Sequence, residues 1–179
     1  MSQKILTTPR LKLLKKIQNE EELLFPFFAD PSVMRYIRDG STSAPDQVRE
    51  SLKKHQNHWD AFGHGFLTIF DKETGEFMGR CGLIHLAMQH DNPEVELGYL
   101  LYEKFWGKGY ATEVAQELLR WGLEELELPS IIGAVRKENK ASQNVLKKIG
   151  MVPLREGIYP GTEVVCNYYQ VDEKRAILS

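Results

Sequence analysis

The sequence predicts an α+β fold in which a mixed, mostly antiparallel sheet is flanked by helices. Runs of β-branched and aromatic residues alternate with stretches of helical periodicity along the 179 residues. No linker, low-complexity segment or internal repeat divides the chain. We therefore expect a single domain over residues 1–179.

The strands are expected from alternating or continuously apolar runs. In the first run Leu11 and Leu13 should face the core, and a polar loop over 71–76 predicts a hairpin. Gly79 and Gly82 in the second strand of that hairpin indicate a bulge or a close backbone approach. The expected strands cover residues 5–14, 66–70, 77–86, 95–102, 131–135, 152–159 and 163–171.

The helices are expected from apolar residues at i, i+3/4 and i+7 and from capping residues. Asn19, Ser43 and Asn139 each stand at a predicted helix start, where a short polar side chain can accept from a free backbone N–H. Pro26 should kink or shorten the first helix. The expected helices cover residues 19–28, 31–36, 44–61, 111–123 and 139–150.

The order strand, helix, strand over 95–135 fixes one feature of the sheet. A strand over 95–102 and a short apolar strand over 131–135 are joined through a helix, which predicts a right-handed parallel crossover between them. The three strands that precede the glycine segment, over 66–70, 77–86 and 95–102, are expected to be antiparallel.

The composition narrows the classes of function. With 23 Lys and Arg against 25 Asp and Glu, the chain carries no field that would point to nucleic acid or an anionic membrane. The absence of a long apolar segment favours a soluble, cytoplasmic protein. Cys81 and Cys166 lie in strand-like runs and are expected to be buried thiols. His55 and His58 are three apart on one helix, but no third ligand lies nearby, so solvated or capping histidines are favoured over a metal site.

The segment 104–112, Lys-Phe-Trp-Gly-Lys-Gly-Tyr-Ala-Thr, lies between a strand and a helix. Gly107 and Gly109 allow a tight turn and a close approach of a ligand to the backbone. The first N–H groups of the helix have no internal partner and lie at the positive end of its dipole. The segment is therefore suited to bind a phosphate or pyrophosphate, although a glycine turn that merely leads into a helix is the simpler alternative.

Three phosphate-binding patterns can be compared with this segment. The P-loop needs a terminal Gly-Lys followed by Ser or Thr, and the dinucleotide fingerprint needs Gly or Ala where Thr112 stands, so neither fits. The acyl-CoA pyrophosphate pattern, Arg/Gln-x-x-Gly-x-Gly/Ala, fits residues 104–109 except that Lys104 replaces Arg or Gln.

With this loop the sequence resembles the GNAT superfamily of N-acetyltransferases, and residues 106–113 look most like the Rim type, which acetylates ribosomal-protein N-termini. A second motif supports the resemblance. Residues 139–150, Asn-x-x-Ser-x-x-Val-Leu-x-Lys-x-Gly, resemble the GNAT segment that follows the loop after one intervening strand. The likeness is strong over 95–151 and weak over 44–62 and after 152.

The resemblance implies that the parallel strands splay apart and that the pantetheine arm of acetyl-CoA enters between them. Backbone groups of Leu100 and Leu101 would then pair with the pantetheine amides, and the loop would bind the pyrophosphate. Asn139 and Ser142 would face the acyl or cofactor side. The implied cofactor-binding loop residues are Lys104, Trp106, Gly107, Lys108, Gly109, Tyr110, Ala111 and Thr112.

Acetyl transfer needs a deprotonated amine, a polarised thioester carbonyl and a proton for the leaving thiolate. Glu96 is the candidate base, working directly or through water, and lies on the same strand face as Gly98. An exposed Glu at a sheet margin is the alternative. Many GNAT enzymes have Tyr where Leu146 stands, and Leu cannot donate a proton. Ser142, one turn earlier, is the expected replacement, although a Ser that only bonds to its own helix is about as plausible.

The acceptor is a primary amine, either a protein N-terminus or a small molecule. The candidate pocket walls are 34–43, 85–92 and 159–167. The leading hypothesis is direct transfer in a ternary complex, because no Cys lies in the two motifs. The alternative is a catalytically silent acyl-CoA-binding module. The sequence leaves a monomer and a homodimer equally open.

Overall fold

The computed structural model describes residues 5–15 and 17–172, and the two ends of the predicted domain, 1–4 and 173–179, lie outside the described residues. Eight strands form one sheet in the order β1-β2-β3-β4-β5-β6-β8-β7. Only β5 and β6 are parallel among the described strands. The predicted mixed, mostly antiparallel sheet with one parallel pair is therefore confirmed.

The strands agree with the predicted runs at most positions. The predicted strand over 5–14 is instead a hairpin of two strands, because the turn at Pro9 and Arg10 interrupts it. Leu11 and Leu13 are fully buried, as expected. The strands are β1 Ile5–Thr7, β2 Leu11–Leu14, β3 Phe66–Asp71, β4 Phe77–His85, β5 Val95–Leu101, β6 Ser130–Arg136, β7 Val152–Ile158 and β8 Val165–Asp172.

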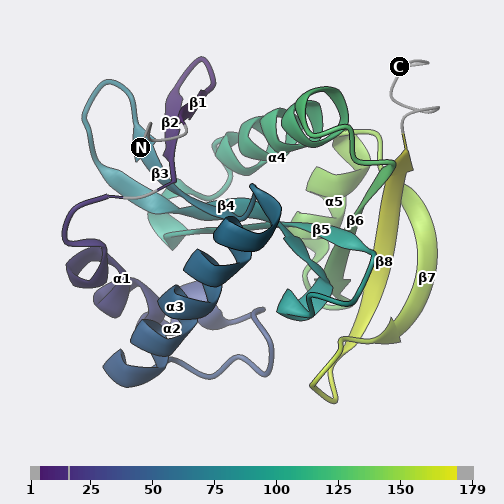
Figure 1. Ribbon diagram of the computed structural model, residues 1–179, viewed down its shortest axis with the longest axis horizontal. Coiled ribbons are helices and arrows are strands. Elements are labelled where there is room, and N and C mark those ends of the chain that lie inside the picture. The colour runs from purple at the N-terminus through teal and green to yellow at the C-terminus, as the bar shows by residue number, and fades with distance from the viewer. Residues whose placement is uncertain (1–4, 16, 173–179) are drawn as a thin grey trace.

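Helices cover both faces of the sheet (Figure 1). In Figure 1 α3 crosses in front of the central strands, whereas α4 lies above them, near α5. Pro26 lies inside α1 without ending it. The helices are α1 Glu20–Phe28, α2 Pro31–Met34, α3 Pro45–Phe62, α4 Tyr110–Arg120 and α5 Lys140–Lys148, with short turns η1 Leu86–Met88, η2 Glu103–Phe105 and η3 Trp121–Glu125.

The three predicted caps have different outcomes. Asn139 caps α5, because its side chain accepts from the Ser142 N–H. Asn19 precedes α1 but is left-handed and makes no cap hydrogen bond. The prediction for Ser43 is wrong by one residue: Ala44 is the N-cap, and the Gln47 side chain accepts from its N–H instead.

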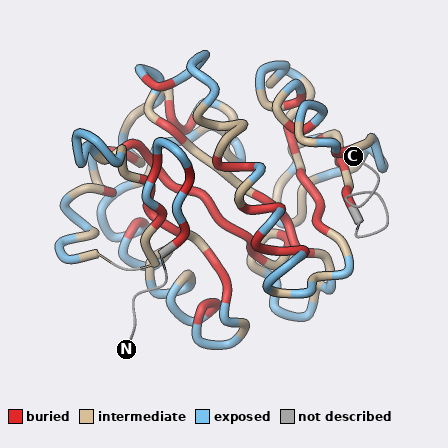
Figure 2. Tube along the Cα trace, turned by 90° about the horizontal axis from the view of Figure 1, so that it is seen from above, coloured by how far each residue is buried: buried red, intermediate tan, exposed pale blue. Residues whose placement is uncertain are grey.

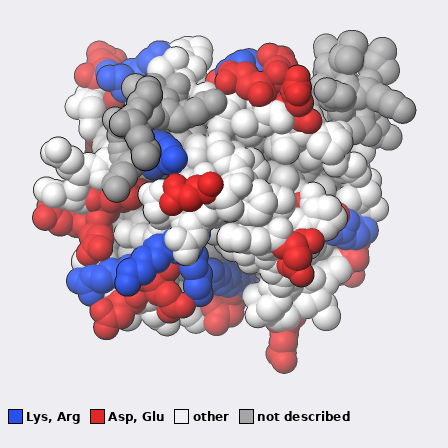
Figure 3. Space-filling view, in the orientation of Figure 1, with Lys and Arg blue, Asp and Glu red and all other residues white. Residues whose placement is uncertain are grey.

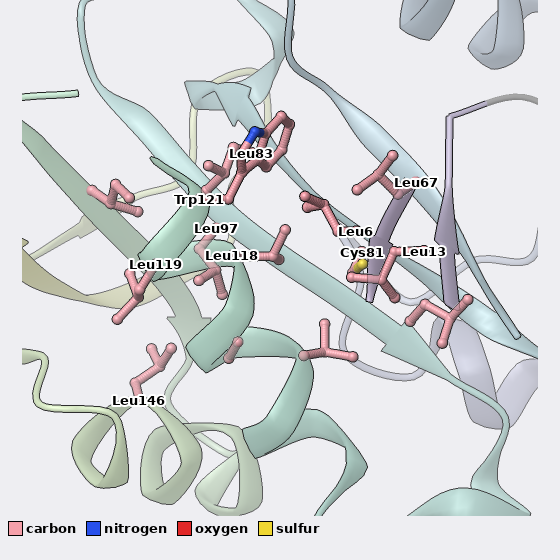
Figure 4. Close-up of a cluster of buried hydrophobic side chains, with 14 of the residues drawn as sticks. Leu6, Leu13, Leu67, Cys81, Leu83, Leu97, Leu118, Leu119, Trp121 and Leu146 are labelled. Atoms are coloured by element: carbon pink, nitrogen blue, oxygen red, sulfur yellow. The ribbon is translucent and has the colours of Figure 1, made fainter. Parts of the chain in front are cut away.

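The main core lies between the sheet and α4. It combines inward residues of β2 to β6 with the apolar face of α4 (Figure 4). Figure 2 shows the buried residues running along the central strands and the exposed ones on helix surfaces and loops. A second cluster packs α1 and α2 with Val48 of α3 beneath the other face. The central strands are thus fixed from both sides, which holds β5 firmly in place.

Glycines let the backbones approach closely at the centre of the sheet. A Cβ on Gly79 would lie 2.0 Å from the Leu100 carbonyl oxygen, and one on Gly82 would lie 2.4 Å from the Gly65 carbonyl oxygen. Both distances are too short for any side chain. The close approach predicted at these two glycines is therefore confirmed.

Of the two alternatives expected for the histidines, solvated or capping, solvation does not hold for His58, whereas His55 is half-buried. His58 is fully buried; its Nδ1 lies 2.9 Å from the His64 carbonyl oxygen, and its Nε2 accepts from the His85 N–H at 3.0 Å. Burial lowers the pKa of His58 to about 4. His55 contacts Arg80 through its Nδ1 at 2.9 Å. These rings therefore serve as neutral hydrogen-bonding groups of the interior.

Candidate active site

The glycine loop leads from β5 into α4 with its backbone in unusual conformations. Gly107 has φ +72° and Gly109 has φ +80°, which L-residues rarely adopt. A Cβ on Gly107 would meet no atom within 4 Å, so the loop surface is open there. The Trp106 indole N–H donates to the Leu101 carbonyl at 2.9 Å and fastens the loop to the end of β5.

The first turn of α4 adds free donors to this surface. Gly109 is the N-cap, and the first bond of the helix runs from the Glu113 N–H to the Gly109 carbonyl at 3.1 Å. The N–H groups of Tyr110, Ala111 and Thr112 therefore have no acceptor within the helix and point out of its N-terminus. Together with the loop they can receive an anion such as a pyrophosphate.

The two lysines of the loop differ in what they contact. The Lys104 side chain is exposed, and its ammonium bonds to the Glu76 carboxylate on the β3–β4 hairpin. The Lys108 carbonyl accepts from Arg10, a residue of the β1–β2 turn. The Lys104 ammonium is therefore bonded to the β3–β4 hairpin. The loop backbone is instead contacted by the guanidinium of Arg10, which lies outside the sequence motif.

The parallel pair is open beyond its first contact. Strands β5 and β6 are paired at Glu96 and Ile132, and no further pair joins them within the described residues. Each strand is fully paired on its other side, β5 with β4 and β6 with β8. The backbone edges of 97–101 and 133–136 are therefore available to a ligand that enters between them. The predicted splay is confirmed.

Glu96 lies where the opening begins. Its side chain is 7% exposed, and its carboxylate accepts from the Tyr159 hydroxyl at 2.6 Å. Burial raises the pKa of Glu96 to about 7, although the hydrogen bonds from Tyr159 and from the Ala87 backbone act in the opposite direction. Glu96 is therefore not the exposed strand Glu of the alternative hypothesis, and it titrates near neutrality.

Ser142 lies on the other side of the opening. Its Oγ is 2.6 Å from the hydroxyl of Tyr99, a residue of β5. Because side chains alternate along a strand, Tyr99 points to the α4 and α5 side of the sheet, opposite to Glu96. Leu146 is buried against Gly133 and leaves no hydroxyl at its own position. The Tyr99–Ser142 pair thus joins β5 to α5 across the opening.

Asn139 and Leu101 have hydrogen bonds that limit what else they can bind. The Asn139 carboxamide oxygen accepts from the Ser142 N–H at 3.1 Å, which fixes the start of α5. The Leu101 carbonyl accepts from Trp106. The Leu100 carbonyl is directed toward Gly79 of β4, since a Cβ on that glycine would lie 2.0 Å from its oxygen, so strand alternation directs the backbone groups of Leu101 toward the opening.

Two of the three predicted acceptor walls, 85–92 and 159–167, contact Glu96, whereas the first wall contacts the end of β6. The turn η1, from 85–92, brings Leu86 against Tyr159 and Val164 of the third wall. The first wall is joined to β6 by Arg136, whose guanidinium lies 3.5 Å from the carbonyl oxygens of Arg35 and Arg38. The bidentate pair of Glu94 with Arg155, at 2.6 Å for each bond, fastens the start of β5 to β7.

The described residues contain neither a candidate metal site nor a helix that could span a membrane. No cluster of three or more His, Cys, Asp or Glu suited to a metal ion occurs within 5–15 and 17–172. In the same residues no helix is long and apolar enough to cross a membrane. Acidic and basic side chains are interspersed on the face in Figure 3, without a continuous field of one sign.

Comparison with known proteins decides the family. Residues 10–152 match the model of the acetyltransferase (GNAT) domain. The chain is a GNAT-family N-acetyltransferase. It is 34% identical over 148 residues to YkkB of Bacillus subtilis, which covers 82% of this chain and 84% of that protein. An acetyltransferase structure from Agrobacterium tumefaciens is 30% identical, with a TM-score of 0.79 and coverage of 97% and 96%.

The Rim-type resemblance is supported less strongly. The structure of RimL, a ribosomal α-N-protein acetyltransferase in complex with coenzyme A, has a TM-score of 0.77 but 16% identity, with coverage of 94% and 98%. That likeness shows the shared GNAT fold alone. The donor of this GNAT enzyme is acetyl-CoA, and the chain fits it: the Gly107 backbone leaves room for a phosphate, and the sheet is open where a pantetheine arm would lie.

Three residues of the site escaped the sequence analysis. Arg10 and Glu113 meet at the loop although 103 positions separate them in the sequence, and nothing in their sequence context predicts that contact. Tyr99 could have been found, because strand alternation places it on the helix side of a strand whose other face carries Glu96. Leu146 carries no hydroxyl, which indicates that a neighbouring residue must supply one.

Proposed function

We propose that this enzyme transfers the acetyl group of acetyl-CoA directly to a primary amine, with Glu96 as the general base. The observation that carries the proposal is a buried carboxyl with a pKa near 7 at the point where the parallel strands separate. A base is most useful when its pKa lies near the working pH.

The acceptor amine reaches the site as an ammonium ion with a pKa of about 8 to 10. Glu96 takes the proton, directly or through a water molecule, and the nitrogen lone pair then attacks the thioester carbon. The Tyr159 hydroxyl donates to the Glu96 carboxylate and keeps it oriented in an otherwise apolar surrounding. A backbone N–H near Leu100 polarises the carbonyl oxygen as charge develops on it.

The leaving thiolate needs a proton from the opposite side. Ser142 is the proposed donor: its hydroxyl proton passes to the thiolate, the Tyr99 hydroxyl at 2.6 Å stabilises the Oγ by a hydrogen bond, and water returns the proton to Ser142 afterwards. Tyr99 stays protonated at neutral pH, because burial raises its pKa to about 12. An acyl-enzyme route is disfavoured, since Cys81 is fully buried and burial raises its pKa, and Cys166 is also buried.

We infer a protein N-terminus or a small-molecule amine as the acceptor. The Rim-like loop over 106–113 favours a peptide α-amine. In either case the ammonium would lie beside Glu96, with Tyr159 and the η1 turn as the nearest walls.

The release of free CoA from acetyl-CoA tests this function with a panel of peptides, polyamines and amino-acid derivatives. Glu96→Gln should lower kcat about 100-fold with the best acceptor, the lower range for loss of a general base. Glu156→Gln, an exposed carboxylate bonded to Lys137, is the control and should leave kcat unchanged. Binding of acetyl-CoA without turnover of any amine would instead identify a silent acyl-CoA-binding module.

The pH dependence follows from the same carboxyl. Below pH 7 Glu96 is increasingly protonated and cannot accept a proton, so kcat/KM should fall as the pH drops through about 7. The acidic limb should be absent in Glu96→Gln. A wild-type profile that is flat from pH 5 to 8 would contradict the assignment of Glu96.

A further inference from the structure

The β1–β2 turn is attached to the start of α4 through Glu113. The Arg10 Nε donates to Glu113 Oε2 at 2.6 Å, and the Arg10 backbone N–H donates to Glu113 Oε1 at 2.9 Å. The Thr8 hydroxyl donates to the same Oε1 at 2.5 Å. Glu113 is 14% exposed, so these charge-assisted bonds are partly shielded from water.

Arg10 also contacts the glycine loop itself. Its Nη1 donates to the Lys108 carbonyl at 3.0 Å, across 98 positions of sequence. The guanidinium carbon lies 4.1 Å from the centre of the Tyr110 ring, and Nη2 lies 3.5 Å from where a Cβ on Gly109 would stand. One side chain therefore contacts three consecutive residues of the loop and the helix that follows it.

The turn that carries Arg10 is itself well fixed. The Lys72 ammonium donates to the Thr8 carbonyl at 2.5 Å, and the Lys72 N–H donates to the Arg10 carbonyl at 2.9 Å. The Leu11 N–H donates to the Thr8 hydroxyl at 3.0 Å. Arg10 thus projects from a turn attached to the β3–β4 hairpin, and can act as a rigid brace.

The bond to the Lys108 carbonyl determines which way the next N–H points. In a trans peptide the C=O of one residue and the N–H of the following residue point in opposite directions. With the Lys108 carbonyl directed at Arg10, the Gly109 N–H points away from Arg10. Glycine does not resist rotation of this peptide by itself, so an external contact is needed to keep one orientation.

We propose that Arg10 is a positioning residue that holds the loop 106–109 in its phosphate-binding conformation before acetyl-CoA arrives. The Arg10 guanidinium, carried on the β1–β2 turn, donates a hydrogen bond to the loop backbone. The Lys104 ammonium bonds to Glu76 instead. The proposal rests on the use of acetyl-CoA and is independent of the acceptor and of Glu96. Preorganisation lowers the ordering cost of binding and so raises affinity for the donor.

Calorimetric titration of CoA tests the proposal without any turnover. Arg10→Gln should weaken CoA binding about tenfold, the effect of losing one or two net hydrogen bonds. Arg10→Lys should recover little of this loss, because one ammonium cannot reach Glu113 and Lys108 in two fixed directions at once. Binding by Arg10→Gln within twofold of wild type would overturn the proposal.

Arg49→Gln is the matched control. Arg49 is 46% exposed against 43% for Arg10, bonds to two carboxylates at 3.1 and 2.7 Å, and lies 4.9 Å from the Phe25 ring centre. It belongs to α3 and contacts neither the loop nor α4 among the described contacts. Its substitution should leave the Kd for CoA unchanged, and an equal loss in both variants would overturn the proposal.

Two further measurements separate positioning from direct binding. In the ligand-free protein, Arg10→Gln should speed amide hydrogen exchange of residues 106–111 at least severalfold, whereas a residue that only binds the ligand would leave it unchanged. The loss of affinity should also be equal for CoA and 3′-dephospho-CoA, since both carry the pyrophosphate. A loss confined to CoA would assign Arg10 to the 3′-phosphate and refute the positioning role.

Glu113→Gln keeps the proposal testable should Arg10→Gln fold poorly. The amide oxygen can still accept from Thr8, but the ion pair with Arg10 is lost. We expect about threefold weaker CoA binding, from the loss of one partly exposed charge pair, and faster exchange at 106–111. A folded Glu113→Gln variant with wild-type exchange and Kd would overturn the proposal. A protein that acetylates no amine but shows these binding effects would refute only the proposed function.

Discussion

The two sides of the site are built in different ways. The donor side consists of the loop 103–109 and the first turn of α4, so most of its groups are consecutive backbone N–H groups. The acceptor side gathers Glu96, Tyr159 and the η1 turn from strands and loops far apart in sequence. The donor side depends on backbone conformation, whereas the acceptor side depends on the burial of individual side chains.

This difference explains which substrate each side can specify. A backbone cradle reads the pyrophosphate common to all acyl-CoA donors and leaves little room for variation. Side chains carried on three separate walls can be exchanged one at a time without disturbing the sheet. Donor use is therefore a property of the family, and acceptor choice is a property of the individual protein.

Gly109→Glu should produce the largest effect and tests the donor side. The side chain would force a non-glycine residue into φ +80° and place a carboxylate beside the phosphates, so CoA affinity should fall at least about 100-fold by calorimetry. Gly75→Glu is the control, because Gly75 has φ +71° in an open hairpin turn. Similar losses in both variants would mean that backbone strain alone, and not the cradle, explains the effect.

Ser142→Ala should follow and tests the link between the two sides. Loss of the hydroxyl that bonds to Tyr99 should lower kcat about tenfold, less than the usual effect of a general acid, because water can protonate a thiolate. The KM for acetyl-CoA should stay the same. Tyr99→Phe and the double variant should show the same fall in single-turnover rates; additive losses would show that the two hydroxyls do not act as one unit.

Tyr159→Phe tests the acceptor side alone. Without the Tyr159 hydroxyl the Glu96 carboxylate loses a hydrogen bond that stabilises its charged form, so its pKa should rise further above 7. At pH 7 kcat/KM should fall about twofold, for a pKa shift of roughly half a unit, and recover at pH 9. Tyr168→Phe, whose hydroxyl bonds to the Ile158 carbonyl, should leave the pH profile in place. An unshifted profile in Tyr159→Phe would contradict the coupling.

Lys104→Arg should have the smallest effect. The motif alone predicts that Lys in place of Arg weakens pyrophosphate binding, so that Arg would improve affinity. In the structure the Lys104 ammonium bonds to Glu76, and Arg can bond to the same carboxylate. The Kd for CoA should therefore change by less than about twofold, well below one lost hydrogen bond. A clearly lower Kd for CoA in Lys104→Arg would show that residue 104 contributes to pyrophosphate binding.

The donor side could be predicted from the sequence because its chemistry is local. Gly107, Gly109 and the helix that follows are adjacent, and the Asn139 cap also depends on neighbours within one turn. Sequence patterns report such short-range geometry well. The candidate base Glu96 was named through resemblance, but its burial and its bond to Tyr159 depend on how distant strands pack.

Features set by tertiary packing could not be predicted in the same way. Strand β8 lies between β6 and β7, although β7 comes first in the chain. The brace from Arg10 to Glu113 joins residues 103 positions apart. Pro26 lies in the last turn of α1, and burial of Leu24 and Phe27 compensates for the one backbone hydrogen bond that Pro26 cannot donate.

The single backbone pair at Glu96 and Ile132 has a mechanical consequence. The sheet consists of two parts, β1 to β5 and the strands β6, β8 and β7, which are joined by one backbone pair and through the helices α4 and α5. Acetyl-CoA bound along the free edges of β5 and β6 would form backbone hydrogen bonds that the two strands do not make with each other. It would therefore connect the two parts of the sheet for as long as it is bound. The melting temperature should therefore rise with donor concentration, as expected for any ligand that binds only the folded protein.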